Sequence, residues 1–317
     1  MPASRHGTAV TKTTKRAPRK PVTHDARRLA TFRAQLLAWY DANKRDLPWR
    51  VTKDAYAIWL SEIMLQQTRV AVVKEYYPRF LRRFPSVEAL ARARISSVLA
   101  VWSGLGYYRR ARALHAAAGK LVREFGGEIP PTAKQLQALP GVGRYTAAAI
   151  ASIAFGESDP VVDGNVERVI TRVWARKFTN DGVWDVAGKL LDRTRPGDFN
   201  QAMMELGAKV CLPRDPLCDG CPVNKWCASK GDFGECATEP RKRAKVRYCL
   251  ATRDGSVFLV RRPRQASLMP GMWELPEFGD QPGPSSNGAA GFKLRHAITV
   301  TDFYVEVLPG DPPNGTS

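Results

Sequence analysis

Four cysteines crowded between residues 211 and 227 constrain the fold of this chain more than any other sequence feature. Their spacing is Cys-x6-Cys-x2-Cys-x5-Cys, in a loop that also contains proline. Four thiolates in one short loop can hold zinc or an iron–sulfur cluster. Zinc sites usually join two close cysteine pairs across a longer spacer, so this compact loop favours the cluster. We therefore expect one [4Fe–4S] cluster held by Cys211, Cys218, Cys221 and Cys227.

The charge balance points to a polyanionic partner. Among 317 residues, 49 are Lys or Arg and 30 are Asp or Glu, which gives a formal charge of +19. The first 24 residues contribute only six of these cations and contain no acid. Most of the basic excess therefore belongs to the rest of the chain, which predicts a body that binds DNA or RNA.

The sequence predicts no membrane span and no secretory signal, because it lacks a long apolar run. We expect a soluble protein of the bacterial cytoplasm or nucleoid. Residues 1–24 are basic and lack apolar periodicity, which predicts a disordered tail. An organelle transit peptide is the alternative for this tail. The two remaining cysteines, Cys236 and Cys249, are interpreted as plain thiols.

Hydrophobic periodicity predicts a mainly α-helical body over residues 25–236. Expected helices begin at residue 25 and recur at 59–68, 76–84, 87–102, 111–125 and 133–139. Residues 237–246 are interpreted as a charged linker. Residues 247–317 are expected to form a short α+β domain, with a hairpin around Asp254-Gly255 and a last strand near 302–308.

Glu62 lies in an apolar helix, WLSEIMLQQT, among Trp59, Leu60, Ile63 and Met64. A carboxyl group in such surroundings loses hydration, which raises its pKa and lets it keep a proton near neutral pH. Gln66, at the i+4 position, can share its helix face. The alternative is an exposed Glu on an amphipathic helix.

The segment LPGVGRYTA, residues 139–147, predicts a helix-hairpin-helix. Its two glycines permit a tight turn, and the helix that follows presents unpaired N–H groups to a phosphate. Such a hairpin holds a DNA backbone without reading sequence. The expected DNA contacts are Gly141, Val142, Gly143, Arg144 and Thr146.

Asp163 follows an apolar run and precedes a helix, in the segment VVDGNV. Its position is typical of a helix N-cap. A capping carboxylate can still direct an oxygen into a cleft, so a catalytic role is compatible with the cap.

These motifs, with GLGYY and FNQAMMELGA, occur in the order found in the MutY adenine DNA glycosylase family of the endonuclease III superfamily, which the chain resembles over about residues 28–310. The resemblance implies a two-lobed helical body with a cleft between the lobes. One lobe, about residues 50–155, is a helical barrel that carries the hairpin. The other combines both ends of the body with the cluster loop at 211–227.

Members of this family remove adenine mispaired with 8-oxoguanine or guanine. By resemblance, Glu62 is the acid that protonates the leaving adenine and later activates water, and Asp163 stabilises the cationic sugar. Tyr145 lies against the sugar, and Asn165 supports Asp163. The implied partner is double-stranded DNA, bound by a monomer that extrudes the adenine.

The resemblance also assigns residues around the base. Gln67 and Tyr107 are implied to wedge into the vacated base stack. The implied adenine pocket consists of Arg45, Leu47, Trp49, Arg50 and Glu205.

The C-terminal domain resembles a Nudix fold, most clearly at GMWELPEF, but it lacks the Glu-rich metal-binding helix, so we expect no pyrophosphatase activity. In the family this domain reads 8-oxoguanine through a Phe-Ser-His loop. The corresponding stretch here is Arg295–Val300, where Thr299 keeps a hydroxyl in place of the Ser, but the Phe and the His of the family loop are absent, and His296 lies earlier in the stretch. These two residues are the candidates for lesion recognition.

Two rival functions remain open at this point. One is an endonuclease III-like glycosylase and lyase that acts on damaged pyrimidines. The other is an iron–sulfur DNA-binding protein without catalytic activity, which the Glu62/Asp163 pair disfavours.

Tyr145 separates the first rival from a monofunctional glycosylase, because lyases of the superfamily carry a Lys there that forms a Schiff base. A tyrosine cannot form this adduct. We expect borohydride added during turnover to trap no covalent enzyme–DNA species on a denaturing gel. A trapped adduct that maps to a lysine would contradict the monofunctional assignment.

Overall fold

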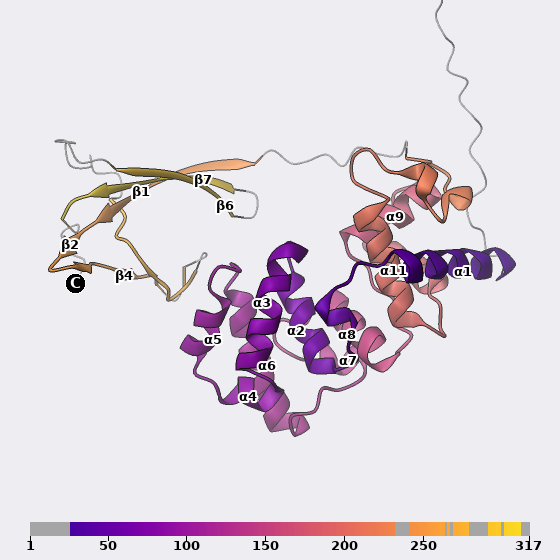
Figure 1. Cartoon of the computed structure of the whole chain (residues 1–317), viewed down its shortest axis with the longest axis horizontal. Coiled ribbons are helices and arrows are strands. Elements are labelled where there is room, and N and C mark those ends of the chain that lie inside the picture. The colour runs from indigo at the N-terminus through magenta and orange to yellow at the C-terminus, as the bar shows by residue number, and fades with distance from the viewer. Residues whose placement is uncertain are drawn as a thin grey trace, which may run out of the picture. The chain divides into compact units, whose positions relative to one another are not determined.

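The computed structural model describes residues 26–231, 241–263, 265–266, 269–278, 291–298 and 301–311. This part of the chain forms two compact units, one of helices and one of strands (Figure 1). The predicted tail (1–24), Cys236, residues 237–240 of the linker and Thr299 lie outside the described residues. No helix in the described ranges is long and apolar enough to cross a membrane.

Eleven α-helices, with three short 3-10 helices, build the helical unit within the described residues. The α-helices are α1 (Ala26–Asn43), α2 (Ala55–Leu65), α3 (Val70–Arg83), α4 (Val87–Arg92), α5 (Ile95–Trp102), α6 (Arg109–Phe125), α7 (Ala133–Leu136), α8 (Arg144–Phe155), α9 (Gly164–Trp174), α10 (Asn180–Leu190) and α11 (Pro196–Lys209). The 3-10 helices are η1 (Pro48–Arg50), η2 (Cys218–Gly220) and η3 (Asn224–Trp226).

Two predicted helices, 59–68 and 133–139, end earlier than expected, at Leu65 of α2 and at Leu136 of α7. Helix α2 stops at Leu65 because Gln66 turns out of the helical region at ψ 109° and Gln67 adopts a positive φ of 56°. Gln66 therefore does not continue the face of Glu62. The stretch 87–102 is two helices rather than one, since Ala93 and Arg94 take extended angles between α4 and α5.

Both ends of the helical unit share one hydrophobic core. Helix α1 packs beside α11 (Figure 1). Buried side chains of α1, α9, α10 and α11 form a single cluster. Trp226, from the cysteine loop, also belongs to this cluster, and its ring meets Phe32 of α1 edge-on at 6.1 Å. This packing joins the first described helix to the cysteine loop.

Helix α2 is buried on nearly every side. Nine of its eleven residues are buried, including Glu62, and it packs against α3 and α8. A helix that is apolar all round must lie inside a protein rather than on its surface. The packing that buries Trp59 and Leu60 therefore also buries the carboxyl group of Glu62 on the same helix.

The second unit contains the strands β1 (Lys242–Leu250), β2 (Thr252–Arg253), β3 (Ser256–Val257), β4 (Val260–Arg261), β5 (Trp273–Glu274), β6 (Phe292–Ile298) and β7 (Thr301–Pro309). Strand β7 lies between β1, with which it is parallel, and β6, with which it is antiparallel. The predicted hairpin is present as β2 and β3, whose turn residues Asp254 and Gly255 both have positive φ. Strand β1 begins inside the stretch read as a linker, because Lys242 already pairs with Thr301.

Helix α11 approaches α8 closely at Gly197, which gives a stability prediction. A Cβ on Gly197 would lie 2.6 Å from the carbonyl oxygen of Ser152 and 2.8 Å from Cα of Ile153. Because both are backbone atoms, Gly197→Ala should lower the free energy of unfolding by about 2 kcal/mol in urea titrations. In the control Gly188→Ala, the added Cβ meets nothing closer than Pro160 at 3.8 Å. That variant should gain up to about 1 kcal/mol. Equal effects of the two changes would contradict the packing.

Candidate active site

One cavity of about 260 Å³ in the helical unit brings together the predicted catalytic and pocket residues. Most of its lining residues come from the stretch 45–50, from helices α2, α8 and α11, and from the start of α9. All nine residues predicted for catalysis and for the adenine pocket line it: Arg45, Leu47, Trp49, Arg50, Glu62, Tyr145, Asp163, Asn165 and Glu205. These side chains come from segments far apart in the sequence.

Glu62 faces this cavity from α2 and is only 5% exposed. Its Oε2 atom is buried without a hydrogen-bond partner among the described residues. Burial raises its pKa from the usual 4.5 to about 7; the nearby Asp163 adds to this rise, while the hydroxyl of Tyr145 and the charge of Arg50 oppose it. A carboxyl group with this pKa is partly protonated at neutral pH and can donate a proton.

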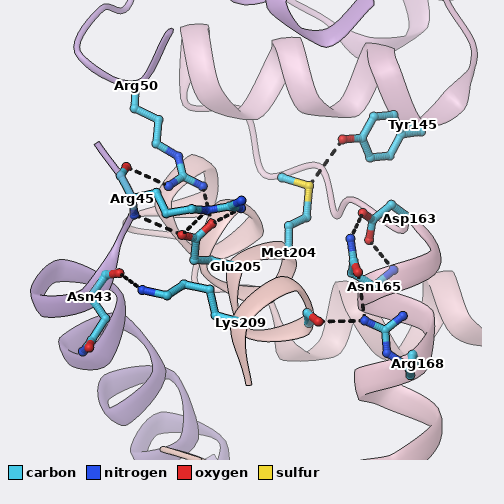
Figure 2. A network of polar contacts seen from close by, with 11 residues as sticks. Asn43, Arg45, Arg50, Tyr145, Asp163, Asn165, Arg168, Met204, Glu205 and Lys209 are labelled. Carbon is cyan, nitrogen blue, oxygen red and sulfur yellow. Dashed lines mark hydrogen bonds and ion pairs between the residues drawn. The ribbon is translucent and has the colours of Figure 1, made fainter. Parts of the chain in front are cut away.

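Asp163 caps α9, as its sequence position predicts. One carboxylate oxygen accepts hydrogen bonds from the backbone N–H groups of Asn165 at 2.9 Å and Val166 at 2.7 Å. The other accepts from the side-chain amide of Asn165 at 2.8 Å (Figure 2). Arg168 in turn donates to the amide oxygen of Asn165 at 2.8 Å. The cap therefore fixes the orientation of a carboxylate that also lines the cavity.

Tyr145 enters the cavity from the first turn of α8. Its hydroxyl donates to the sulfur of Met204 at 3.3 Å (Figure 2). Burial, together with the negative charges of Glu62 and Asp163, raises its pKa well above 10. The phenol is therefore neutral across the physiological range, and it lines the same cavity as Glu62 and Asp163 without adding a charge.

Glu205 forms a buried ion-pair network with two arginines. Its side chain is fully buried, and Arg45 donates to both of its oxygens, at 2.8 and 2.7 Å (Figure 2). Arg50 donates to Oε2 at 2.8 Å. Burial by itself would raise the pKa of Glu205, but the hydrogen bonds from Arg45 and Arg50 outweigh it and lower the pKa to about 2. Glu205 is therefore an ionised anchor rather than a proton donor.

Several cavity residues were not singled out from the sequence. Four of the lining residues lie on one face of α11: Gln201, Met204, Glu205 and Ala208. Their three- and four-residue spacing is that of one helix face. Helical periodicity counted from Glu205 would therefore have predicted Met204 and Gln201 as cavity residues. Ser61 and Ile58 reach the cavity from α2 in the same way.

The hairpin leads into α8 as predicted. Gly141 has a φ of +77°, and a Cβ there would lie 2.6 Å from that of Ala113, so the turn requires glycine. Helix α8 begins without a side-chain cap, which leaves its first N–H groups for a ligand. Arg144 lies over the ring of Trp184 at 3.9 Å and pairs with Asp181 at 3.3 Å.

The other residues predicted to contact DNA or to recognise the lesion differ in their exposure to solvent. Gln67 is exposed just beyond α2, and Tyr107 is 38% exposed. Thr146 is buried and accepts a hydrogen bond from Gln66 at 3.1 Å. His296 is exposed in β6, opposite Phe303 of β7.

The four predicted cysteine ligands line a second cavity, whose wall is almost entirely apolar. Arg168 donates to the carbonyl of Cys211 at 2.8 Å, and Arg172 approaches its sulfur at 3.5 Å. No group of three or more His, Cys, Asp or Glu in the described ranges is placed to hold a metal ion.

Comparison with known proteins relates this chain to DNA repair glycosylases. Residues 60–182 match the family described as HhH-GPD superfamily base excision DNA repair protein, a range that includes Glu62, Tyr145 and Asp163. A thermostable thymine-DNA glycosylase of known structure is 31% identical, with a TM-score of 0.60 over 64% of this chain and 97% of that one. The predicted helical fold is therefore confirmed.

The adenine DNA glycosylase of Rattus norvegicus is 46% identical over 76% of this chain and 52% of its own length. That of Schizosaccharomyces pombe is 33% identical over 81% and 72%. The chain belongs to the adenine DNA glycosylase family, as the motifs predict. It spans about half the length of the rat and mouse relatives.

The Glu205 network predicts a pH-dependent stability. Because the folded-state pKa of Glu205 is about 2 and its usual pKa is 4.5, the contribution of Glu205 is complete above about pH 4.5 and is lost as the pH falls toward 2. Glu205→Gln should lower the free energy of unfolding by about 3 kcal/mol at pH 7, because it leaves two arginines without their anion. This deficit should shrink at pH 3.

The matched control is Glu124→Gln, which removes an exposed partner of Lys120 at 3.6 Å. Its effect should stay within about 0.5 kcal/mol. A Glu205→Gln deficit that is the same at pH 3 and pH 7 would contradict the ionised anchor.

Proposed function

We propose that this chain is a monofunctional DNA glycosylase that releases adenine mispaired with 8-oxoguanine or guanine. The observation that carries the proposal is the pair formed by Glu62, a buried acid with a pKa near 7, and Asp163, an oriented carboxylate in the same cavity. Membership of the adenine DNA glycosylase family supports the choice of adenine.

The two carboxyl groups divide the reaction between them. Glu62 transfers its proton to the adenine, at N7 by family analogy, so the C1′–N9 bond breaks with its electron pair leaving on a neutral base. The sugar becomes an oxocarbenium ion, whose positive charge the Asp163 carboxylate stabilises. Water then attacks C1′ and gives a proton back to Glu62. This division resembles the acid and carboxylate pair of glycoside hydrolysis.

The remaining cavity residues support this chemistry without reacting. Neutral Tyr145 presents an oxygen near both carboxyl groups and has no amine for a Schiff base, which supports hydrolysis over a lyase reaction. Asn165 fixes the orientation of Asp163. Arg45, Arg50 and Glu205, with the buried side chains of Leu47 and Trp49, form a preorganised wall for the extruded base.

We also propose that Cys211, Cys218, Cys221 and Cys227 hold one [4Fe–4S] cluster. The donor set fits, because four thiols surround one apolar cavity. A cubane distributes its thiolates over different irons, so its ligands need to surround a volume rather than converge on one point. The bound cluster would supply a structural link, since the loop also contributes Trp226 to the core shared with α1.

We further propose that the C-terminal unit has a Nudix-like fold and recognises the opposite base, with His296 and Thr299 as the candidate residues. The exposure of His296 in β6 supports this assignment. Duplex DNA is the proposed partner. Its binding is supported by the charge of +19 and by the uncapped start of α8.

A single-turnover assay tests the proposed function. Duplexes that carry adenine opposite 8-oxoguanine or opposite guanine should release free adenine, and a thymine-glycol duplex should release nothing. The rate should fall about tenfold per unit as the pH rises above the Glu62 pKa of about 7, because the acid form disappears.

Glu62→Gln should lower this rate by at least about a hundredfold. The control Glu75→Gln changes an exposed carboxylate of α3 and should leave the rate unchanged. Absence of adenine release from both mispaired duplexes would reject the proposed function. Adenine release by Glu62→Gln at the normal rate would instead reject the assignment of the acid.

A further inference from the structure

One arginine, Arg110 in the first turn of α6, binds two separate loops through a single guanidinium group. Its Nη1 donates to three carbonyl oxygens at the end of α2, those of Ile63, Met64 and Gln66. Its Nη2 donates to the hydroxyl of Thr68 at 2.9 Å and to the carbonyls of Leu105 and Gly106, both at 3.3 Å. The two loops are separated by more than thirty residues in the sequence.

The first of these loops is the C-terminal end of α2, where the last carbonyl groups of a helix have no partner inside the helix. A cation at this end also meets the negative pole of the helix dipole. Arg110 therefore stabilises the abrupt turn after Leu65. Gln67, in the middle of that turn, has a φ of 56°, which a residue other than glycine adopts only when its surroundings hold it there.

The second loop runs from Ser103 to Gly106 and is held from several sides. Tyr76 donates to the carbonyl of Ser103 at 2.8 Å, and the indole of Trp102 donates to that of Gly106 at 3.1 Å. Arg110 also lies over the Trp102 ring at 5.4 Å. The loop leads directly into Tyr107, whose φ of 49° is again in the left-handed region.

We propose that Arg110 is a positioning residue that couples the loops carrying Gln67 and Tyr107, so that these two side chains enter the DNA stack as one preset unit. This inference rests on the proposed function, in which both residues wedge into the duplex. A planar guanidinium can donate in several fixed directions at once, which a lysine ammonium on a flexible stem cannot reproduce. Arg110→Lys therefore keeps the charge and removes the coupling.

The experiment measures base extrusion separately from chemistry. A duplex carries the fluorescent base 2-aminopurine next to an adenine opposite 8-oxoguanine, and its fluorescence rises when the neighbouring stack opens. With Arg110→Lys, both the opening rate and the excision rate should fall about tenfold. The pH dependence of excision should keep its midpoint, because Glu62 is untouched. The control Arg123→Lys, an exposed position on the same helix, should behave as wild type.

Opening at the wild-type rate by Arg110→Lys would overturn the inference, and so would a shifted pH midpoint, because the residue would then act on the acid. If Arg110→Lys does not fold, Thr68→Val removes one of the bonds and should slow opening to a smaller extent. Unchanged opening in Thr68→Val would then overturn the coupling. If the wild-type protein opens the base stack but releases no adenine, the proposed function is rejected. The comparison of opening rates between wild type and Arg110→Lys still tests the coupling in that case.

Discussion

The desolvation of the Glu62 carboxyl group is the interaction on which the rest of this structure depends. A carboxylate loses its hydration when it is buried, and the protein offers Oε2 no hydrogen bond among the described residues in return. The group responds by holding a proton, which raises its pKa to about 7. Burial on this scale requires α2 to be enclosed by α3 and α8, so the helical packing and the acid are two consequences of one apolar sequence.

Three acidic residues line the same cavity, and each meets a different environment. Glu62 has apolar neighbours and keeps a proton. Asp163 accepts three hydrogen bonds as the cap of α9, and Glu205 is neutralised by two arginines. Because their environments differ, the three carboxyl groups serve different roles: Glu62 donates a proton, Asp163 stabilises positive charge, and Glu205 anchors two arginines. Asn165 and Met204 serve this division by orienting Asp163 and Tyr145.

Most of the fold and the site composition could be predicted from the sequence, because short motifs encode local structure. The hairpin glycines, the Asp163 cap and the Asp254-Gly255 turn all depend on contacts within a few residues. The resemblance placed distant residues in one pocket, but the individual hydrogen bonds between distant residues could not be predicted. Arg110, more than forty positions along the chain from the end of α2, donates to the carbonyls of Ile63 and Met64, and no local pattern indicates this contact. The pairing of Glu205 with Arg45 likewise depends on the packing of α11 beside α1, which local periodicity does not specify.

Glu62 carries a proton near neutral pH because it is buried, and the titration of its carboxyl group can be observed directly at the carboxyl carbon. Side-chain 13C labelling of glutamate, with Glu62→Gln to assign the resonance, gives the titration curve of this single group in the free protein. We expect a midpoint near pH 7. A midpoint near the usual 4.5 would mean that Glu62 is ionised at neutral pH, and it would contradict the account of the acid.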